Sequence, residues 1–172
     1  MNQEDMRRIE ETVEYEWDNK ALLVQAFTTV AHANENPDAV HNGILEHGGD
    51  KSLEMTVHHA IMIHRTRIDK KGRLVSKYDK HGMSILEDRI VNNQHIAQRM
   101  RILGLNQYLI MSRGEELNHE ENSDSILSKL FEAIIGAVAV DSGYDLITVS
   151  RVVLRMMGAD DWDTLLARYE GD

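Results

Sequence analysis

The sequence has no cysteine, a single proline (Pro37) and only 5% aromatic residues, and these scarcities narrow the classes of protein that it can form. Without cysteine, neither a disulfide framework nor a thiolate metal site can be built. No apolar run approaches the roughly 20 residues that a membrane-spanning helix needs. The N-terminus lacks the pattern of a secretory signal peptide. We therefore expect a soluble, cytoplasmic protein with no membrane partner.

Positive charge is also scarce, because 19 Lys and Arg residues stand against 29 Asp and Glu residues, for a formal net charge of −10. Strong binding to nucleic acid depends on Lys and Arg that neutralise phosphates, so this balance argues against it. The distribution is uneven, however, because seven basic residues lie between positions 65 and 80, opposed only by Asp69 and Asp79. This segment is either a solvated loop or a phosphate-binding surface formed by Arg65, Arg67, Lys70, Lys71, Arg73, Lys77 and Lys80.

Apolar residues recur at helical spacing through most of the chain, and 172 residues are enough for one domain with its own core. The pattern predicts irregular backbone over 65–82 and helices elsewhere. The expected N-caps are Asp18 or Asn19 for the second helix, Asp38 for the third, and Ser123 or Asp124 for the helix that follows. The predicted fold is all-α, with residues 1–172 in a single domain and helices over 5–15, Leu22 to Val30, 38–65, 84–103, 124–140, 145–154 and 160–169.

One acidic stretch, from Asn42 to Asp50, lies inside the long third helix. Glu46 and Asp50 are four residues apart and therefore share a helix face, which Glu54 continues one turn later. Stacked carboxylates repel one another, so this face is either solvated or holds a cation. The adjacent Gly48 and Gly49 cost roughly 1 kcal/mol each within a helix, which predicts a packing or close-approach role.

A second stretch places the carboxylate of Glu132 in an apolar helix, where it loses hydration unless it finds a partner. Two helices that both direct carboxylates inward can form an oxygen-ligand site for Mg²⁺ or Mn²⁺. The late histidines of the third helix fit such a site poorly, because consecutive histidines point about 100° apart and no His-Glu-x-x-His pattern is present. We interpret His58, His59 and His64 as structural or surface residues.

The two acidic stretches together resemble those of the ribonuclease III family. The family's first motif reads Asn-Glu-Arg-Leu-Glu-Phe-Leu-Gly-Asp, and its second reads Asp-x-x-Glu-Ala-x-x-Gly-Ala, with Asp-Ser-Gly a few residues later. Residues 42–50, 129–137 and 141–143 are similar to them in order and spacing. Further similar segments, covering roughly residues 8 to 157 in all, are 17–28, 82–93, 103–105, 108–109 and 114–116. The resemblance implies the helical bundle of a ribonuclease III endonuclease domain.

Family members hold their metal ion with two acids from each motif, and the resemblance implies that Glu46, Asp50 and Glu132 bind Mg²⁺ or Mn²⁺ here. One of the four metal-holding acids is missing, because Lys129 stands where the second motif has its Asp. The early Glu of the first motif is also absent, and Gly43 stands in its place. A lysine would repel a divalent cation about 4 Å away by several kcal/mol. Lys129 would instead pair with the three carboxylates as a built-in cation.

Two interpretations therefore stand side by side. In one, the chain is a metal-dependent endoribonuclease with a rearranged site, in which Lys129 contacts the scissile phosphate. In the other, the Lys129 ion pair replaces the metal, and a catalytically inactive relative serves as an RNA-binding or protein-interaction module. Double-stranded or structured RNA, rather than DNA, is the nucleic acid that the resemblance implies, and the basic residues between 65 and 80 would bind it.

The resemblance also implies a homodimer, because family dimers cut both strands with two active sites across a two-fold cleft. The family's Phe that inserts into the partner subunit is His47 here, and the Leu after it is Gly48. An imidazole still fills part of such a socket, and His47 is the expected dimer contact. The double-stranded-RNA-binding domain that follows many ribonuclease III catalytic domains is not expected in this chain.

Overall fold

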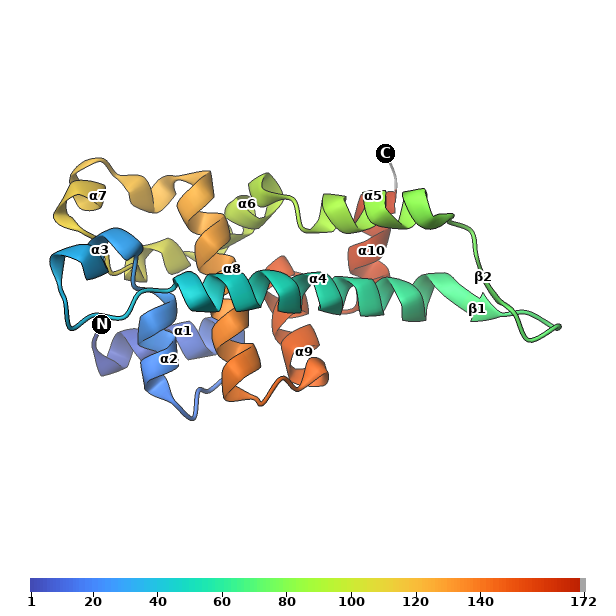
Figure 1. Ribbon diagram of the computed structural model, residues 1–172, viewed down its shortest axis with the longest axis horizontal. Helices are drawn as coiled ribbons and strands as arrows, with labels where there is room; N and C mark the ends of the chain where they lie inside the picture. The colour runs from blue at the N-terminus through green and yellow to red at the C-terminus, as the bar shows by residue number, and fades with distance from the viewer. Residues whose placement is uncertain (171–172) are drawn as a thin grey trace.

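The computed structural model describes residues 1–170 and confirms the all-α prediction (Figure 1). Two helices dominate: the 23-residue α4 runs along the length of the molecule, and α8 crosses it near its N-terminal half. The elements are α1 Gln3–Val13, α2 Lys20–Ala26, α3 Val30–Glu35, α4 Gly43–Arg65, β1 Thr66–Ile68, β2 Leu74–Ser76, α5 Lys80–Ile90, α6 Asn93–Leu103, η1 Leu105–Tyr108, α7 Arg113–Leu117, η2 Glu120–Asn122, α8 Asp124–Asp141, α9 Leu146–Met157 and α10 Trp162–Glu170.

The core surrounds α8, which is the most apolar helix and is buried along most of its length. Leu127, Phe131 and Ile135 are fully buried on it and belong to one continuous buried cluster. The helices that pack against α8 are α2, α4, α6 and α9. Burial of each such side chain contributes about 1.5–3 kcal/mol to folding. The backbone at Glu132 on this helix is consequently held in a fixed place.

The long helix begins later than predicted, at Gly43 with Asn42 as its N-cap, so the prediction of an N-cap at Asp38 is wrong. The backbone nitrogen of Asn42 donates to the carbonyl of Thr28, and its side-chain amide donates to the carbonyl of Ala26. These bonds tie the segment before α4 to the end of α2 and hold it out of the helix. Asn19 caps α2 as predicted, accepting a bond from the Ala21 nitrogen.

The predicted irregular segment 65–82 instead forms a β-hairpin and the start of α5. β1 and β2 pair antiparallel, with Thr66 opposite Ser76, Arg67 opposite Val75 and Ile68 opposite Leu74. The hairpin continues directly from the end of α4 and projects beyond the helical body (Figure 1).

The predicted helix 84–103 is two helices, α5 and α6, separated at Val91 and Asn92. The Asn92 side chain accepts bonds from the nitrogens of Gln94 and His95 and so begins α6 anew. The last two predicted helices are confirmed as α9 and α10, with slightly shifted ends. Within residues 1–170, no helix is long and apolar enough to cross a membrane.

Candidate metal-binding and RNA-binding site

The predicted acidic residues lie around the point where α4 crosses α8. The two backbones approach so closely at Gly49 and Gly136 that neither residue can carry a side chain. A methyl group on Gly49 would lie 2.8 Å from the Gly136 nitrogen and would collide with the Glu132 carbonyl oxygen, and one on Gly136 would collide with the Leu45 carbonyl. The prediction of a close approach is therefore confirmed at Gly49, whereas Gly48 faces open space. This crossing brings Glu46 and Asp50 of α4 beside Glu132 of α8.

Lysines partner two of the three acids. The Lys129 Nζ lies 3.7 Å from the Glu46 Oε1, so the expected ion pair is present for that carboxylate. The Lys51 Nζ lies 2.9 Å from the Asp50 Oδ2 and 2.8 Å from the Glu54 Oε2. Sequence reasoning missed Lys51, because neighbouring residues on a helix do not face each other and only a long, flexible side chain can reach back.

The surroundings of Glu132 shift the pKa of its carboxyl group. Burial, together with the negative charges of Asp50 and Glu46, raises the pKa of Glu132 to about 7, and Lys129 offsets only part of this effect. The three carboxylates therefore act on one another electrostatically. Negative charge that the lysines do not cancel remains at the crossing, and a cation bound there would relieve it.

The carboxylate oxygens at the crossing are suitable ligands for a divalent cation, but their side chains are not arranged around a common point. Carboxylate oxygens are the ligands that Mg²⁺ and Mn²⁺ prefer. Within residues 1–170, no set of three or more His, Asp or Glu side chains is arranged to hold a metal ion. Lys51 and Lys129 are exposed, so their ammonium groups can turn into solvent and release the carboxylates. Gly43, at the position of an expected acid, supplies no ligand and opens α4.

The seven basic residues predicted to bind RNA divide into two groups. Arg65 is only 11% exposed at its side chain and pairs with Asp163 and Glu170 of α10. Its guanidinium therefore holds the fold together and is not available to a phosphate. Arg73 pairs with Asp69 at 2.7 Å, and Lys77 lies 3.4 Å from Glu170. The four that form no ion pair with any residue from 1 to 170 are Arg67, Lys70, Lys71 and Lys80.

His47, the predicted dimer contact, lines a pocket of about 480 Å³ beside the crossing. Gly48 forms part of the same wall, and Met55, Tyr144 and Val149 are among its apolar lining residues. Two exposed apolar side chains, Ile44 on α4 and Ile147 on α9, lie on the helices that line the pocket. This surface, which we call the His47 face, combines an open hollow with unburied apolar area.

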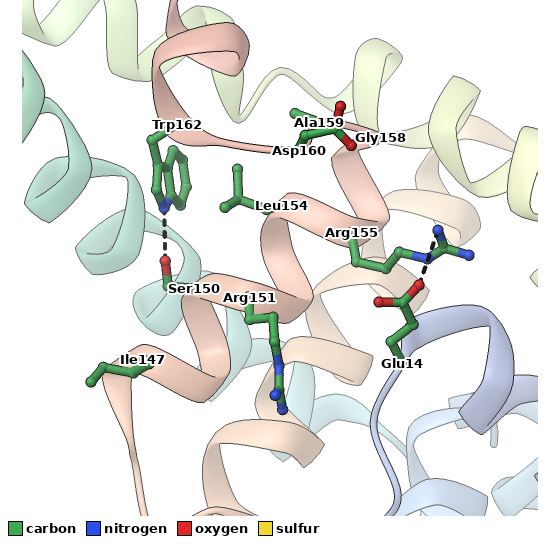
Figure 2. Close-up of a pocket in the computed structure, with 10 residues that line it drawn as sticks. All are labelled: Glu14, Ile147, Ser150, Arg151, Leu154, Arg155, Gly158, Ala159, Asp160 and Trp162. Atoms are coloured by element: carbon green, nitrogen blue, oxygen red, sulfur yellow. Dashed lines mark hydrogen bonds and ion pairs between the residues drawn. The ribbon is translucent and has the colours of Figure 1, made fainter.

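A pocket of about 470 Å³ between the end of α1, α9 and the start of α10 contains none of the predicted site residues (Figure 2). Its polar groups are largely paired: Arg155 contacts Glu14 at 3.2 Å, and the Trp162 indole nitrogen donates to the Ser150 hydroxyl at 2.7 Å. The side chains of Arg151 and Arg155 point in different directions in Figure 2 and do not converge on one point. This pocket is separate from the acidic crossing.

Comparison with known proteins identifies one family to which the chain is similar. Residues 19–158 match the family model described as Ribonuclease-III-like. The chain is 30% identical over 167 residues to the Ribonuclease 3 of Treponema succinifaciens, covering 97% of this chain and 45% of that protein. It is 32% identical over 148 residues to the Ribonuclease 3 of Symbiobacterium thermophilum, covering 86% of this chain and 57% of that protein. The chain spans about half the length of the curated relatives it matches.

Two solved structures share the fold, both of the nuclease domain of ribonuclease III from Campylobacter jejuni. One superposes with a TM-score of 0.73 at 27% sequence identity, covering 88% of this chain and 95% of that chain. The other gives a TM-score of 0.71 at 28% identity, covering 91% and 93%. The first is described as showing structural flexibility in a region involved in dimer formation.

Proposed function

The chain belongs to the ribonuclease III family, and we propose that it is a cytoplasmic, metal-dependent endoribonuclease that acts on double-stranded or structured RNA in RNA processing. The observation that carries the proposal is the meeting of Glu46, Asp50 and Glu132 at the contact between α4 and α8. The negative charges of Asp50 and Glu46 raise the pKa of the partly buried Glu132, and this repulsion costs folding free energy unless a cation offsets it. A site that retains this cost is typical of a functional centre.

The proposed metal ligands are Glu46, Asp50 and Glu132, and the proposed ion is Mg²⁺ or Mn²⁺. When bound, such an ion supplies an activated water and stabilises the negative charge that develops on the phosphate. Lys129 would then turn from Glu46 to contact the scissile phosphate, where its positive charge would also stabilise the developing negative charge. Its exposed side chain and its position within 3.7 Å of Glu46 support this role.

A second function is favoured by one specific observation, which is that lysine side chains form ion pairs with two of the three acids. With Lys129 on Glu46 and Lys51 on Asp50, two of the three carboxylates already have a cation of the chain itself. In this alternative, the lysines replace the metal, no ion is bound, and the domain binds RNA or a protein partner without cutting RNA. Lys129 is the residue at which the two functions differ most.

Two Lys129 variants distinguish these functions in a cleavage assay on labelled duplex RNA with Mg²⁺ or Mn²⁺. If the proposed function is right, the wild-type protein cleaves the duplex. Lys129→Ala should then lower the cleavage rate at least tenfold, while the thermal midpoint of unfolding stays close to that of wild type. If the wild-type protein does not cut and Lys129→Asp creates metal-dependent cleavage, the natural site is disabled and the second function is correct.

We further propose that the protein is a homodimer, with His47 at the contact. The pocket beside His47 and the exposed apolar residues on the helices that line it support this assignment, because exposed apolar patches often mark protein–protein contacts. Two copies related by a two-fold axis would each offer the same face to the other.

A further inference from the structure

The β-hairpin 66–76 has a tip whose conformation is already set. Gly72 has a φ of +75°, which the turn requires. The Asp69 carboxylate accepts bonds from the backbone nitrogens of Lys71 and Arg73 and pairs with the Arg73 guanidinium. Because Asp69 neutralises Arg73 and organises the turn, the side chains of Lys70 and Lys71 are left exposed and without an ion-pair partner in residues 1–170.

The base of the hairpin is also fixed to the helical body. The Ser76 hydroxyl donates to the Arg65 carbonyl at 2.6 Å, and Tyr78 donates to the Glu170 carboxylate at 2.9 Å. Arg65 reaches the same carboxylate and so joins the end of α4 to α10. A two-stranded hairpin alone is marginally stable in water, and these bonds make this one a fixed extension of α4 (Figure 1).

The two faces of the hairpin differ in chemistry. Ile68 and Leu74 are cross-strand partners and therefore share one face, where they are 65% and 56% exposed. Arg67 and Val75 share the other face. The turn adds Lys70 and Lys71 at the end. The hairpin thus presents an uncovered apolar pair next to unpaired positive charge.

The charge pattern selects the class of partner. The segment 65–80 holds seven of the 19 basic residues and two of the 29 acidic ones, so the rest of the chain is strongly acidic and repels a polyanion. The hairpin is therefore the part of the chain best suited to neutralise phosphates. The wide, shallow minor groove of duplex RNA exposes sugars to an apolar pair and phosphates to neighbouring lysines.

We propose that the hairpin 66–76 is a preformed arm that binds the sugar–phosphate backbone of duplex RNA at a site separate from the acidic crossing. Lys70 and Lys71 contact phosphates, and Ile68 and Leu74 lie against the riboses. The base of the arm stands about 24 Å from Asp50, since Thr66 lies sixteen residue steps after Asp50 along α4 and each step rises about 1.5 Å. The inference rests on the proposed RNA function, but it does not require a metal ion or cleavage.

The test is fluorescence anisotropy with a fluorescein-labelled, blunt-ended RNA duplex in EDTA, where metal binding and cleavage are absent. Lys70→Gln with Lys71→Gln should raise Kd by about tenfold or more at about 0.1 M salt, and should reduce the slope of log K against log salt by about 2. The matched control, Arg7→Gln with Arg113→Gln, removes the same charge from exposed positions on α1 and α7 and should leave Kd within about twofold.

A second variant separates the apolar contact from general electrostatics. Ile68→Ser with Leu74→Ser leaves the charge unchanged, and the proposal predicts a several-fold rise in Kd with the salt slope preserved. The proposal is overturned if the lysine variant binds duplex as tightly as wild type, or if the control loses as much affinity. It is also overturned if the lysine variant keeps its RNA affinity but loses self-association in light scattering, because the arm would then bind protein.

These outcomes are distinct from failure of the proposed function. A wild-type protein that binds no duplex in EDTA contradicts the RNA ligand itself. A protein that binds duplex equally well with and without the hairpin lysines contradicts the arm alone. Cleavage that persists in the lysine variant, at a higher RNA concentration, supports both.

Discussion

Gly48 and Gly49 are adjacent in sequence but have opposite physical roles. A Cβ on Gly49 would collide with the Glu132 backbone, whereas a Cβ on Gly48 would meet nothing within 4 Å. We expect Gly49→Ala to lower the free energy of unfolding by about 3 kcal/mol or to prevent folding, because neither backbone can move aside cheaply. We expect Gly48→Ala to be neutral or to add up to about 1 kcal/mol from helix propensity.

Urea unfolding followed by circular dichroism measures both glycine variants on the same scale. If Gly49→Ala unfolds at the same urea concentration as wild type, the close crossing of α4 and α8 does not exist in solution. The sequence predicted a reason for the glycine pair, but only the structure assigns it to one member, because helix-to-helix distance is not encoded in either helix alone.

Glu132 should make stability depend on pH in a defined direction. Its folded pKa of about 7 lies above the ordinary 4.5, so the folded state holds the proton more tightly and the residue's contribution to stability falls as pH rises between these values. In EDTA, Glu132→Gln should match wild type near pH 5 and exceed it by about 1–2 kcal/mol near pH 8, allowing for solvent screening. A difference between the two proteins that does not change with pH would contradict the raised pKa.

At the scale of elements, the helices with strong apolar periodicity could be predicted, but several of their ends could not. Asp38 is a good N-cap by residue type, but tertiary bonds from Asn42 to the end of α2 decide where α4 begins. The break between α5 and α6 depends on Asn92, whose side chain competes for backbone donors within an otherwise helical pattern.

The hairpin left a weak signal in the sequence. Its strands are only three residues long, and the pattern Thr-Arg-Ile, a turn containing Gly72, then Leu-Val-Ser is short enough to be read as a loop. It is supported by contacts with the end of α4 and with α10, and α10 lies far away in sequence. The basic composition of the segment was visible from the sequence, whereas its shape and the pairing of its charges were not.

Arg65 and Arg67 test the division of the basic segment into fold-stabilising and free residues. Arg65→Ala leaves the carboxylate of Glu170, which is largely buried, without its main partner and frees Asp163. We expect this change to lower the free energy of unfolding by about 2–3 kcal/mol. Arg67→Ala removes an exposed, unpaired charge, so its effect on stability should stay within about 0.5 kcal/mol.

Thermal unfolding of the two arginine variants gives the comparison directly. Equal midpoints of unfolding for Arg65→Ala and wild type would mean that Arg65 does not stabilise the fold and is available to bind RNA. A large loss in Arg67→Ala would mean that the hairpin supports the fold rather than extending from it.

For the whole molecule, the fold class and the family were predictable because they depend on the order and spacing of many residues. The two acidic motifs, with their glycines, retain the helix crossing even though Lys129 and Gly43 depart from the pattern. The arrangement of side chains at the site was not predictable, because each carboxylate has several charged neighbours and the three-dimensional distances decide which pair forms.

The oligomeric state depends on the whole surface, and the His47 face is its proposed contact. We expect light scattering at micromolar concentration to give twice the monomer mass of 19.7 kDa. Met55→Glu places a charge beside the pocket and should give monomers. The control is Ile102→Glu on α6, which is similarly exposed, at 64% against 60%, but lies outside the His47 face and should leave the dimer intact. A monomeric wild-type protein would contradict the proposed dimer.

The most direct measurement of the central claim is isothermal titration of the wild-type protein with Mn²⁺, with Glu132→Gln as the matched variant and duplex RNA cleavage measured in the same buffer. The account predicts saturable binding and cleavage in wild type, and loss of both in Glu132→Gln with the fold unchanged by circular dichroism. No binding and no cleavage in wild type would contradict it and would mean that the lysines at the crossing have taken the place of the ion.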